Sequence, residues 1–420
     1  MNWLVENYLT RGFWGDEAWT ALISGLPIGE IIRVTGQDFH PPVYYLLVHG
    51  FIKLFGASEW IRLISVIFAL LTPLAVYGLV KQWMSKRTAG VVAGVVALSP
   101  ILLTYAFEAR AYALLACLSV VSAWAFWKRK WLVYFLVVAV GVYTHYYMWF
   151  ILASQGLYWL IWDRQDWKKV LGVFGGIGLV QMPWIPTLLS QVAAVAKDYW
   201  IAPMDKKTHW EWLVRVTGGD YDTALRPVAV WTILGLVALS LVTVRWREKR
   251  YPKAYWFLWL WLGIPVIVPT VISLYRPVFF YRYLIFSAIP ILALAMWGVA
   301  ALKQKLIYPV GGVIMALYVT INLAGLARYP YTMREEIDKI WAEQHTDKLV
   351  TVLPAFAEVM YYGQDKAPVQ VLPVGIVQFS GKSLLDAYVR QGKVKIEEPG
   401  KNERYWLIEP GPKSSYHEKE

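Results

Sequence analysis

Apolar residues in this chain gather into long blocks that are separated by short polar stretches. A helix needs about 20 apolar residues to cross a hydrocarbon core of about 30 Å. Two of the blocks, 131–144 and 147–162, are short; each could span by tilting, or the pair could form a hairpin near the outer face. The pattern predicts about ten membrane-spanning helices within 61–325, at 63–80, 88–106, 110–127, 131–144, 147–162, 169–189, 227–245, 254–274, 284–301 and 305–325.

The pattern changes after about residue 328, where charges become frequent and apolar runs shorten. Short runs rich in β-branched and aromatic residues predict strands, and longer amphipathic runs predict helices. The stretch 328–412 is therefore expected to form a small C-terminal α/β domain, followed by a disordered tail at 413–420. The expected helices are 335–344 and 383–390, and the expected strands are 348–353, 369–372 and 405–408.

The first 60 residues precede the first spanning block. The apolar stretch 40–55 is too short to span and contains His49 and Lys53, so we expect a helix lying in the membrane interface. The stretch 1–14 lacks the apolar core of a signal peptide. Because the topology described below starts this chain on the outer side, we expect a further spanning helix upstream. The expected class is an all-α polytopic membrane protein with a small C-terminal α/β domain outside the membrane.

Composition agrees with this class. Residues are 58% hydrophobic and only 17% charged, with a mean hydropathy of +0.42, whereas soluble domains carry about a quarter charged residues. The net charge of +12 is compatible with nucleic-acid binding, but the basic residues lie in short loops between apolar blocks, so we expect no nucleic-acid partner. The single cysteine, Cys117, excludes an intrachain disulfide framework and a Cys-based zinc cluster.

Five of the loops between apolar blocks together carry 16 basic residues. If every block spans once, these five loops share one side of the membrane, and an excess of Lys and Arg marks the cytoplasmic side. The other side then holds residues 1–60, the stretch 190–226 and the C-terminal domain. The basic residues are Lys81, Lys86, Arg87, Lys128, Arg129, Lys130, Arg164, Lys168, Lys169, Arg245, Arg247, Lys249, Arg250, Lys253, Lys303 and Lys305.

The polar residues that could bind a substrate or take part in a reaction fall on the opposite, outer side. Singly, each has a simpler explanation, such as a helix cap, a solvated loop or an interfacial anchor. Charges at membrane depth are costly, however, and the convergence of these residues on one side favours a functional site. Arginines there would hold phosphate oxygens, an apolar surround would hold a polyprenyl chain, and a carboxylate would act as general base. The candidates are Asp16, Glu17, Asp38, His40, Glu108, Arg110, His145, Tyr146, Arg276 and Arg282.

These residues also carry a family resemblance. The runs Trp14–Trp19 and Asp38–Tyr45 resemble the first-loop Asp-Glu and Asp-x-His-Pro-Pro motifs of bacterial GT-C membrane glycosyltransferases, of the protein mannosyltransferase-like and rhizobial lipopolysaccharide glycosyltransferase-like type. Glu108–Tyr112 resembles the second acidic motif, and Tyr143–Tyr146 and Arg282–Tyr283 also match. The resemblance extends from about residue 13 to 325, and more weakly through the tail. Phe107 departs from the polar residue that often precedes the second acidic motif.

The resemblance implies a hexosyl- or mannosyltransferase-like enzyme that inverts the anomeric carbon of a polyprenyl-phosphate sugar. Asp16 would be the catalytic base, and Glu17 and Glu108 would support it or position the acceptor. His40, Arg110, His145 and Arg282 would line the phosphate pocket. No cofactor follows with certainty, and a divalent metal ion is one option whose ligands the sequence leaves unknown. The partners would be the lipid-linked sugar, membrane lipid, and a lipid, glycan or protein acceptor at the outer face of the cytoplasmic membrane.

Three other functions remain open from the residues alone. A transporter or lipid flippase would have ionisable groups near the bilayer midplane and inverted repeats, whereas the charges here gather at one side. An O-antigen ligase-like or polymerase-like enzyme would place its key residues in a large later outer loop, and 190–226 has no recognisable motif. A non-catalytic protein that kept the fold would have little reason to retain Asp16, Glu17 and His40.

Overall fold

The computed structural model describes residues 5–195, 200–326, 331–342, 348–376, 381–400 and 403–417. The chain divides into two compact units. One, the sheet unit, combines residues 1–64, 186–200 and 329–420, and the other, the helical unit, combines residues 65–185 and 201–328. The predicted first loop and C-terminal domain therefore belong to a single compact unit, although more than 250 residues of sequence separate them.

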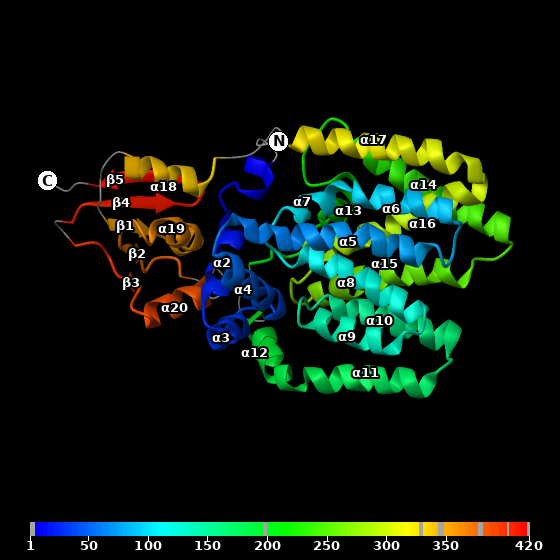
Figure 1. Cartoon of the computed structure of the whole chain (residues 1–420), viewed down its shortest axis with the longest axis horizontal. Helices are drawn as coiled ribbons and strands as arrows, with labels where there is room; N and C mark the ends of the chain where they lie inside the picture. The colour runs from blue at the N-terminus through cyan, green and yellow to red at the C-terminus, as the bar shows by residue number, and fades with distance from the viewer. Residues whose placement is uncertain are drawn as a thin grey trace. The chain divides into compact units, whose positions relative to one another are not determined.

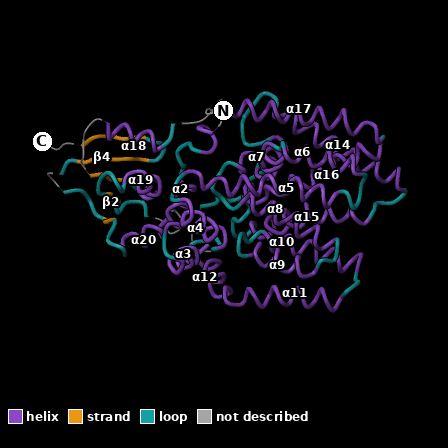
Figure 2. The backbone as a smooth tube through the Cα atoms, viewed as in Figure 1, coloured by secondary structure: helices purple, strands orange, loops and turns teal. Residues whose placement is uncertain are grey.

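The helical unit is built of helices only, among the residues described (Figures 1 and 2). Each of the ten predicted blocks contains a helix, which confirms the all-helical membrane prediction. Six helices in the described chain are long and apolar enough to span a membrane, or seven if one bent pair counts as a single span. The elements are α5 (Leu63–Val80), α6 (Lys86–Ala97), α7 (Pro100–Ala106), α8 (Tyr112–Trp127), α9 (Trp131–Val142), α10 (Met148–Tyr158), α11 (Trp167–Gln181), α13 (Thr208–Gly218), α14 (Arg226–Glu248), α15 (Lys253–Ser273), α16 (Ala288–Leu302) and α17 (Ile307–Leu326).

The bent pair corrects the predicted single helix over 88–106. Helix α6 ends at Ala97, and α7 begins at Pro100 with its axis turned by 57°. Proline has no backbone N–H and its ring clashes with the preceding turn, so a helix breaks or kinks there. Helix α7 therefore directs Tyr105 and the following Phe107–Arg110 turn along a new axis.

Hydrogen bonds join all five basic loops to one another. Lys128 Nζ donates to Gln82 Oε1 at 3.3 Å, and Arg129 donates to Asp163 Oδ1 at 2.7 Å. Lys253 Nζ donates to the Trp162 carbonyl at 2.7 Å, which adds the fourth loop. The fifth loop joins the first through Gln304 Nε2, which donates to the Ser85 and Thr88 hydroxyls, both at 2.8 Å. The five loops thus lie at one end of the helical unit, as the span count requires.

The two short blocks also run between the ends of this unit. Helix α9 starts directly after Lys130 in a basic loop and ends near His145, and α10 returns to Asp163. The contact between Asp163 and Arg129 brings the end of the second block back to the start of the first. Of the two options left open by the sequence, each short helix therefore traverses the unit.

The sheet unit contains a five-stranded sheet of order β3-β2-β1-β4-β5 (Figure 1). Four strands are parallel, and β5 runs antiparallel to β4. Helix α19 packs on β1 and β2, α20 packs on β3 and α3, and α19 also packs on α2. The elements are α2 (Gly15–Gly25), α3 (Ile28–Gln37), α4 (Val43–Phe55), α12 (Ile185–Val195), α18 (Met333–Ala342), β1 (Lys348–Thr351), α19 (Phe356–Gly363), β2 (Val369–Val371), α20 (Ser383–Arg390), β3 (Val394–Ile396), β4 (Tyr405–Glu409) and β5 (Lys413–His417).

The small α/β domain expected at 328–412 is present, with two helices and three strands near their predicted positions. The end of the predicted first helix, 343–344, lies outside the described residues. The sequence prediction missed α19 and β3, which are eight and three residues long, because such short elements carry little periodic pattern.

The predicted disordered tail is wrong for residues 413–417, which form β5. Gly411, at φ +82°, permits the tight turn after β4. Cross-strand ring contacts between Trp406 and Tyr416, 5.1 Å apart, and between Tyr405 and His417, 5.0 Å apart, then hold the strand. Residues 418–420 lie outside the described part of the chain.

Candidate functional site

Asp16 and Glu17 lie in the first turn of α2, where the partial positive charge of the helix N-terminus stabilises carboxylates. Consecutive residues on a helix are rotated by about 100° relative to each other, so the two side chains point in different directions. Asp16 is half-buried, and Glu17 is fully buried. The paired acidic motif therefore consists of two carboxylates in unlike surroundings.

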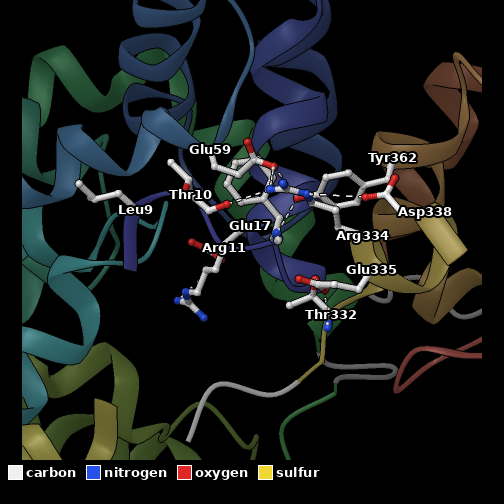
Figure 3. A network of polar contacts seen from close by, with 12 residues as sticks. Leu9, Thr10, Arg11, Glu17, Glu59, Thr332, Arg334, Glu335, Asp338 and Tyr362 are labelled. Carbon is white, nitrogen blue, oxygen red and sulfur yellow. Dashed lines mark hydrogen bonds and ion pairs between the residues drawn. The ribbon is translucent and has the colours of Figure 1, made fainter. Parts of the chain in front are cut away.

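Glu17, which is labelled in Figure 3, forms a buried ion pair with Arg62. Arg62 Nε donates to Glu17 Oε1 at 2.7 Å and Arg62 Nη2 to Glu17 Oε2 at 2.6 Å, and both side chains are 0% exposed. The same guanidinium also donates to the carbonyls of Leu9, Arg11 and Gly12 at 2.7–3.2 Å. Such bidentate pairing satisfies the charge of both groups. Glu17 and Arg62 thereby fix the segment before α2 against the 3-10 turn Glu59–Arg62 of the same unit.

Asp16 follows a segment that is bound by α19. The Phe13 N–H donates to the Tyr362 hydroxyl at 2.6 Å, and the Phe13 ring meets Tyr361 edge-on with centroids 5.1 Å apart. The Tyr362 hydroxyl in turn donates to Glu59 Oε1 at 3.0 Å (Figure 3). The backbone immediately before the candidate base is thus positioned by the C-terminal domain.

The C-terminal domain also brings a carboxyl group, that of Glu358, close to the turn that contains Asp16. A Cβ on Gly15 would lie 3.9 Å from Glu358 Oε2, which places the Glu358 carboxyl beside the first turn of α2. Burial, and secondly the charge of Asp16, raise the pKa of Glu358 from its ordinary 4.5 to about 7. At neutral pH this side chain is therefore protonated in a large fraction of molecules.

The Asp-x-His-Pro-Pro motif forms a second polar cluster in the sheet unit. Asp38 is buried, and its Oδ2 lies 3.4 Å from His40 Nδ1. The imidazole lies against Trp19, whose centroid is 6.0 Å away and which stands one turn after Asp16 on α2. Trp19 is also approached by Gly381, just before α20, so the C-terminal domain contacts this cluster as well. The structure thus places Asp38 and His40 beside Trp19, one turn along α2 from Asp16.

Glu108 and Arg110 lie in the turn between α7 and α8 of the helical unit. Arg110 is buried, with its guanidinium 5.9 Å from the Tyr112 ring centroid, and its carbonyl accepts from Ser65 Oγ at 3.2 Å. The Glu108 Oε2 atom is buried. Both residues therefore occupy the interior of this end of the unit.

An arginine–tyrosine cluster, consisting of Tyr105, Arg215, Asp220, Tyr281 and Arg282, lies near this turn. Tyr105 donates to Asp220 Oδ2 at 2.9 Å, and Arg215 donates to Asp220 Oδ1 at 2.6 Å. The Arg215 guanidinium lies 4.3 Å from the Tyr281 centroid, and Arg282 Nε donates to the Tyr281 hydroxyl at 3.2 Å. Tyr105 is also within electrostatic reach of Glu108. Two cations and one carboxylate leave this cluster with net positive charge.

His145 and Tyr146 occupy neighbouring aromatic surroundings. His145 is buried, its ring lies 4.8 Å from that of Tyr283, and its Nδ1 accepts from the Tyr147 N–H at 3.2 Å. The Tyr146 hydroxyl accepts from Trp184 Nε1 at 2.8 Å. Because Tyr283 adjoins Arg282 in sequence, His145 belongs to the same end of the unit. Arg276, in contrast, is exposed after the end of α15.

Five residues that the sequence prediction missed are central to these clusters: Arg62, Glu358, Tyr105, Arg215 and Asp220. Arg62 immediately precedes the first apolar block, and Asp220 lies in the stretch 190–226, which has no recognisable motif. A signal was present for Asp220, which follows the adjacent glycines Gly218 and Gly219. Among the described residues, no group of three or more His, Cys, Asp or Glu side chains is arranged to hold a metal ion.

The comparisons with known proteins bear on the fold. The family model for dolichyl-phosphate-mannose-protein mannosyltransferase matches residues 39–189. The structure is similar to that of apo ArnT from Cupriavidus metallidurans, with a TM-score of 0.66 over 97% of this chain and 90% of that one, at 14% identity. This chain has the GT-C glycosyltransferase fold. The GT-C resemblance expected from its motifs is thereby confirmed.

Two further structures agree with the GT-C assignment. ArnT from Cupriavidus metallidurans bound to undecaprenyl phosphate matches with a TM-score of 0.62 at 14% identity, over 97% of this chain and 91% of that one. The apo oligosaccharyltransferase of Archaeoglobus fulgidus matches with a TM-score of 0.50 at 11% identity, over 100% of this chain and 73% of that one. A search of curated protein sequences finds no match.

Proposed function

We propose that this protein is a membrane glycosyltransferase that takes a hexose or pentose from a polyprenyl-phosphate donor and inverts its anomeric carbon. The observation that carries the proposal is a set of arginines among aromatic rings at one end of the helical unit: Arg110 is buried, and Arg215 and Arg282 are half-buried. Guanidinium groups bind phosphate oxygens well. The negative charge of a lipid headgroup would compensate the cost of removing these arginines from water.

The fold comparison supports the same donor class. ArnT, which shares the fold over nearly all of this chain, has been crystallised with undecaprenyl phosphate. Fold alone does not specify a reaction, so the assignment depends on the residues. The proposed phosphate-binding residues are Arg110, His145 and Arg282, with Tyr146 and Glu108 beside them. Arg276 is the least supported member, because it is exposed and outside the arginine–tyrosine cluster.

Asp16 is the proposed general base. It would take the proton of the acceptor hydroxyl while the acceptor oxygen attacks the anomeric carbon and the sugar–phosphate bond breaks, its electron pair leaving with the phosphate. Asp38 and His40 would position the acceptor beside it. Glu17 is better suited to a positioning role, because its two oxygens already bind the Arg62 guanidinium.

The test is radiolabel transfer from polyprenyl-phosphate sugars in membranes that contain wild type or Asp16→Asn. We expect the variant to lose about 10²–10⁴-fold in rate, with unchanged expression. Asp365→Asn, an exposed aspartate of the same unit, is the matched control and should keep full activity. Equal transfer by wild type and Asp16→Asn would assign the base to another carboxylate. Absence of transfer from every donor would contradict the glycosyltransferase.

The proposed orientation places the basic loops in the cytoplasm and the C-terminal domain outside. Because Cys117 is the single cysteine and is buried, an introduced cysteine can be labelled selectively. In intact cells an impermeant maleimide should label Lys339→Cys and leave Arg247→Cys unlabelled, although both positions are exposed. The reverse pattern would contradict the orientation while leaving the reaction class intact.

A further inference from the structure

One face of α19 is directed at the segment that leads into Asp16. Glu358, Tyr361 and Tyr362 are spaced i, i+3 and i+4, so they share one side of the helix. Tyr362 and Tyr361 contact Phe13, and Glu358 reaches Gly15. The three contacts follow the chain in order, and the last of them brings a carboxyl group to the turn that contains the candidate base.

The charged surroundings of this carboxyl group are simple. Helix α2 presents Asp16, whose charge acts on Glu358. On α18, Arg334 pairs with Glu59 and Asp338 with Lys366. Glu335 accepts from Thr332 and Glu336 from Ser414, and Lys339 is exposed. Among the described residues, no ion pair neutralises Glu358. It is therefore a half-buried carboxyl group whose charged neighbour carries the same sign.

We propose that Glu358 is a positioning residue that acts through Asp16, so that the C-terminal domain completes the reaction centre. This inference rests on the proposed function, in which Asp16 is the general base. The contacts of Phe13 with α19 hold the carboxyl groups of Asp16 and Glu358 close together. Asp16 comes from the first-loop motif, whereas Glu358 comes from the C-terminal domain.

We expect the protonated form of Glu358 to be the form that assists the transfer reaction. With one proton on Glu358, the pair carries a single negative charge, and that charge is on Asp16, where a base needs it. When Glu358 also ionises, two negative charges stand together at the place where an anionic donor must react, which opposes donor binding. Burial of Glu358 in an α19 face lined by tyrosines keeps the proton on this carboxyl near neutral pH.

The test compares pH profiles of kcat/KM for wild type and Glu358→Gln, whose amide imitates the protonated carboxyl. In wild type, kcat/KM should fall about tenfold for each pH unit above 7, mainly through KM for the donor. In Glu358→Gln the value should stay level over that range. Glu398→Gln, an exposed control in the same domain, should retain the wild-type profile. Identical profiles for wild type and Glu358→Gln would overturn the proposal, and so would a folded Glu358→Gln that is inactive at every pH.

A second measurement does not depend on activity. Infrared difference spectra recorded against Glu358→Gln isolate the protonated carboxyl band of Glu358 during a pH titration. In Asp16→Asn this band should disappear at lower pH than in wild type, because the neighbouring negative charge has been removed. An unchanged titration would overturn the coupling. If wild type transferred no sugar but the titration shifted, the proposed function would fail while the coupling of the two carboxyl groups would stand.

Discussion

Asp16 and Glu17 are neighbours in sequence, yet the structure gives them opposite surroundings. Glu17 is 0% exposed and bound through both oxygens to a buried arginine. Asp16 is half-buried and faces another carboxyl group, Glu358. A rotation of about 100° along the helix places Glu17 against Arg62 and Asp16 beside Glu358.

The difference shows how one acidic dipeptide can serve two purposes. A buried, paired carboxylate stabilises the position of a backbone segment, because it cannot leave without stranding its partner. Asp16, in contrast, is only half-buried, so it is the carboxylate of the two that a substrate can approach. The Glu17–Arg62 pair would therefore hold α2 in place so that Asp16 stays against α19.

The largest expected loss of stability comes from breaking the Glu17–Arg62 ion pair. Arg62→Met leaves the Glu17 charge and the carbonyls of Leu9, Arg11 and Gly12 without this donor. Removing one partner of a buried ion pair costs about 3–5 kcal/mol, so thermal unfolding in detergent should begin at a markedly lower temperature. Glu17→Gln should cost less, because Arg62 keeps its carbonyl partners. A larger loss for Glu17→Gln than for Arg62→Met would contradict this order.

The second effect is a pH dependence of stability caused by Glu358. Its pKa is about 7 in the folded protein and 4.5 ordinarily. Between these values the folded state binds more protons than the unfolded state, so stability falls as pH rises from about 4.5 to about 7 and then levels off. The difference corresponds to at most about 3 kcal/mol. The wild type minus Glu358→Gln difference in unfolding free energy should show this fall, and a difference independent of pH would contradict it.

Sequence patterns predicted the helical unit well because each spanning helix is specified locally. The length of an apolar block and the basic residues that flank it suffice, and the hydrogen bonds among the basic loops agree with the predicted sidedness. The break at Pro100 was missed because the apolar pattern continues through it, although the proline itself was a visible signal.

The site was only partly predictable, for a different reason. Asp16 and His40 belong to motifs, but Arg62 and Glu358 acquire their surroundings from contacts that join distant segments. Glu358 stands 342 positions after Asp16, and α19 was not predicted at all. No local pattern states that a face of this short helix will bind the segment before α2, so the second carboxyl group could not be found from the sequence.

A smaller effect is expected from Tyr362→Phe. This change removes the acceptor of the Phe13 N–H and a donor to Glu59. A part-buried polar group left without its partner costs about 1–3 kcal/mol, so the unfolding temperature should fall moderately. Tyr361→Phe, which keeps the ring against Phe13, is the matched control and should have a weaker effect. Equal losses for the two variants would show that the hydroxyl of Tyr362 is not what binds the segment.

The smallest effect lies in the turn between β4 and β5, far from α2 in the sequence. Gly411→Ala places a side chain at φ +82°, a left-handed conformation that costs an L-residue about 1–2 kcal/mol. Because β5 is an edge strand bound to β4 alone, the strain should loosen this strand locally. Hydrogen exchange should accelerate in Lys413–His417, while the exchange of α2 and α19 and the pH profile of transfer stay unchanged. If exchange in α2 also accelerated, the surroundings of Asp16 would depend on the whole sheet rather than on the face of α19.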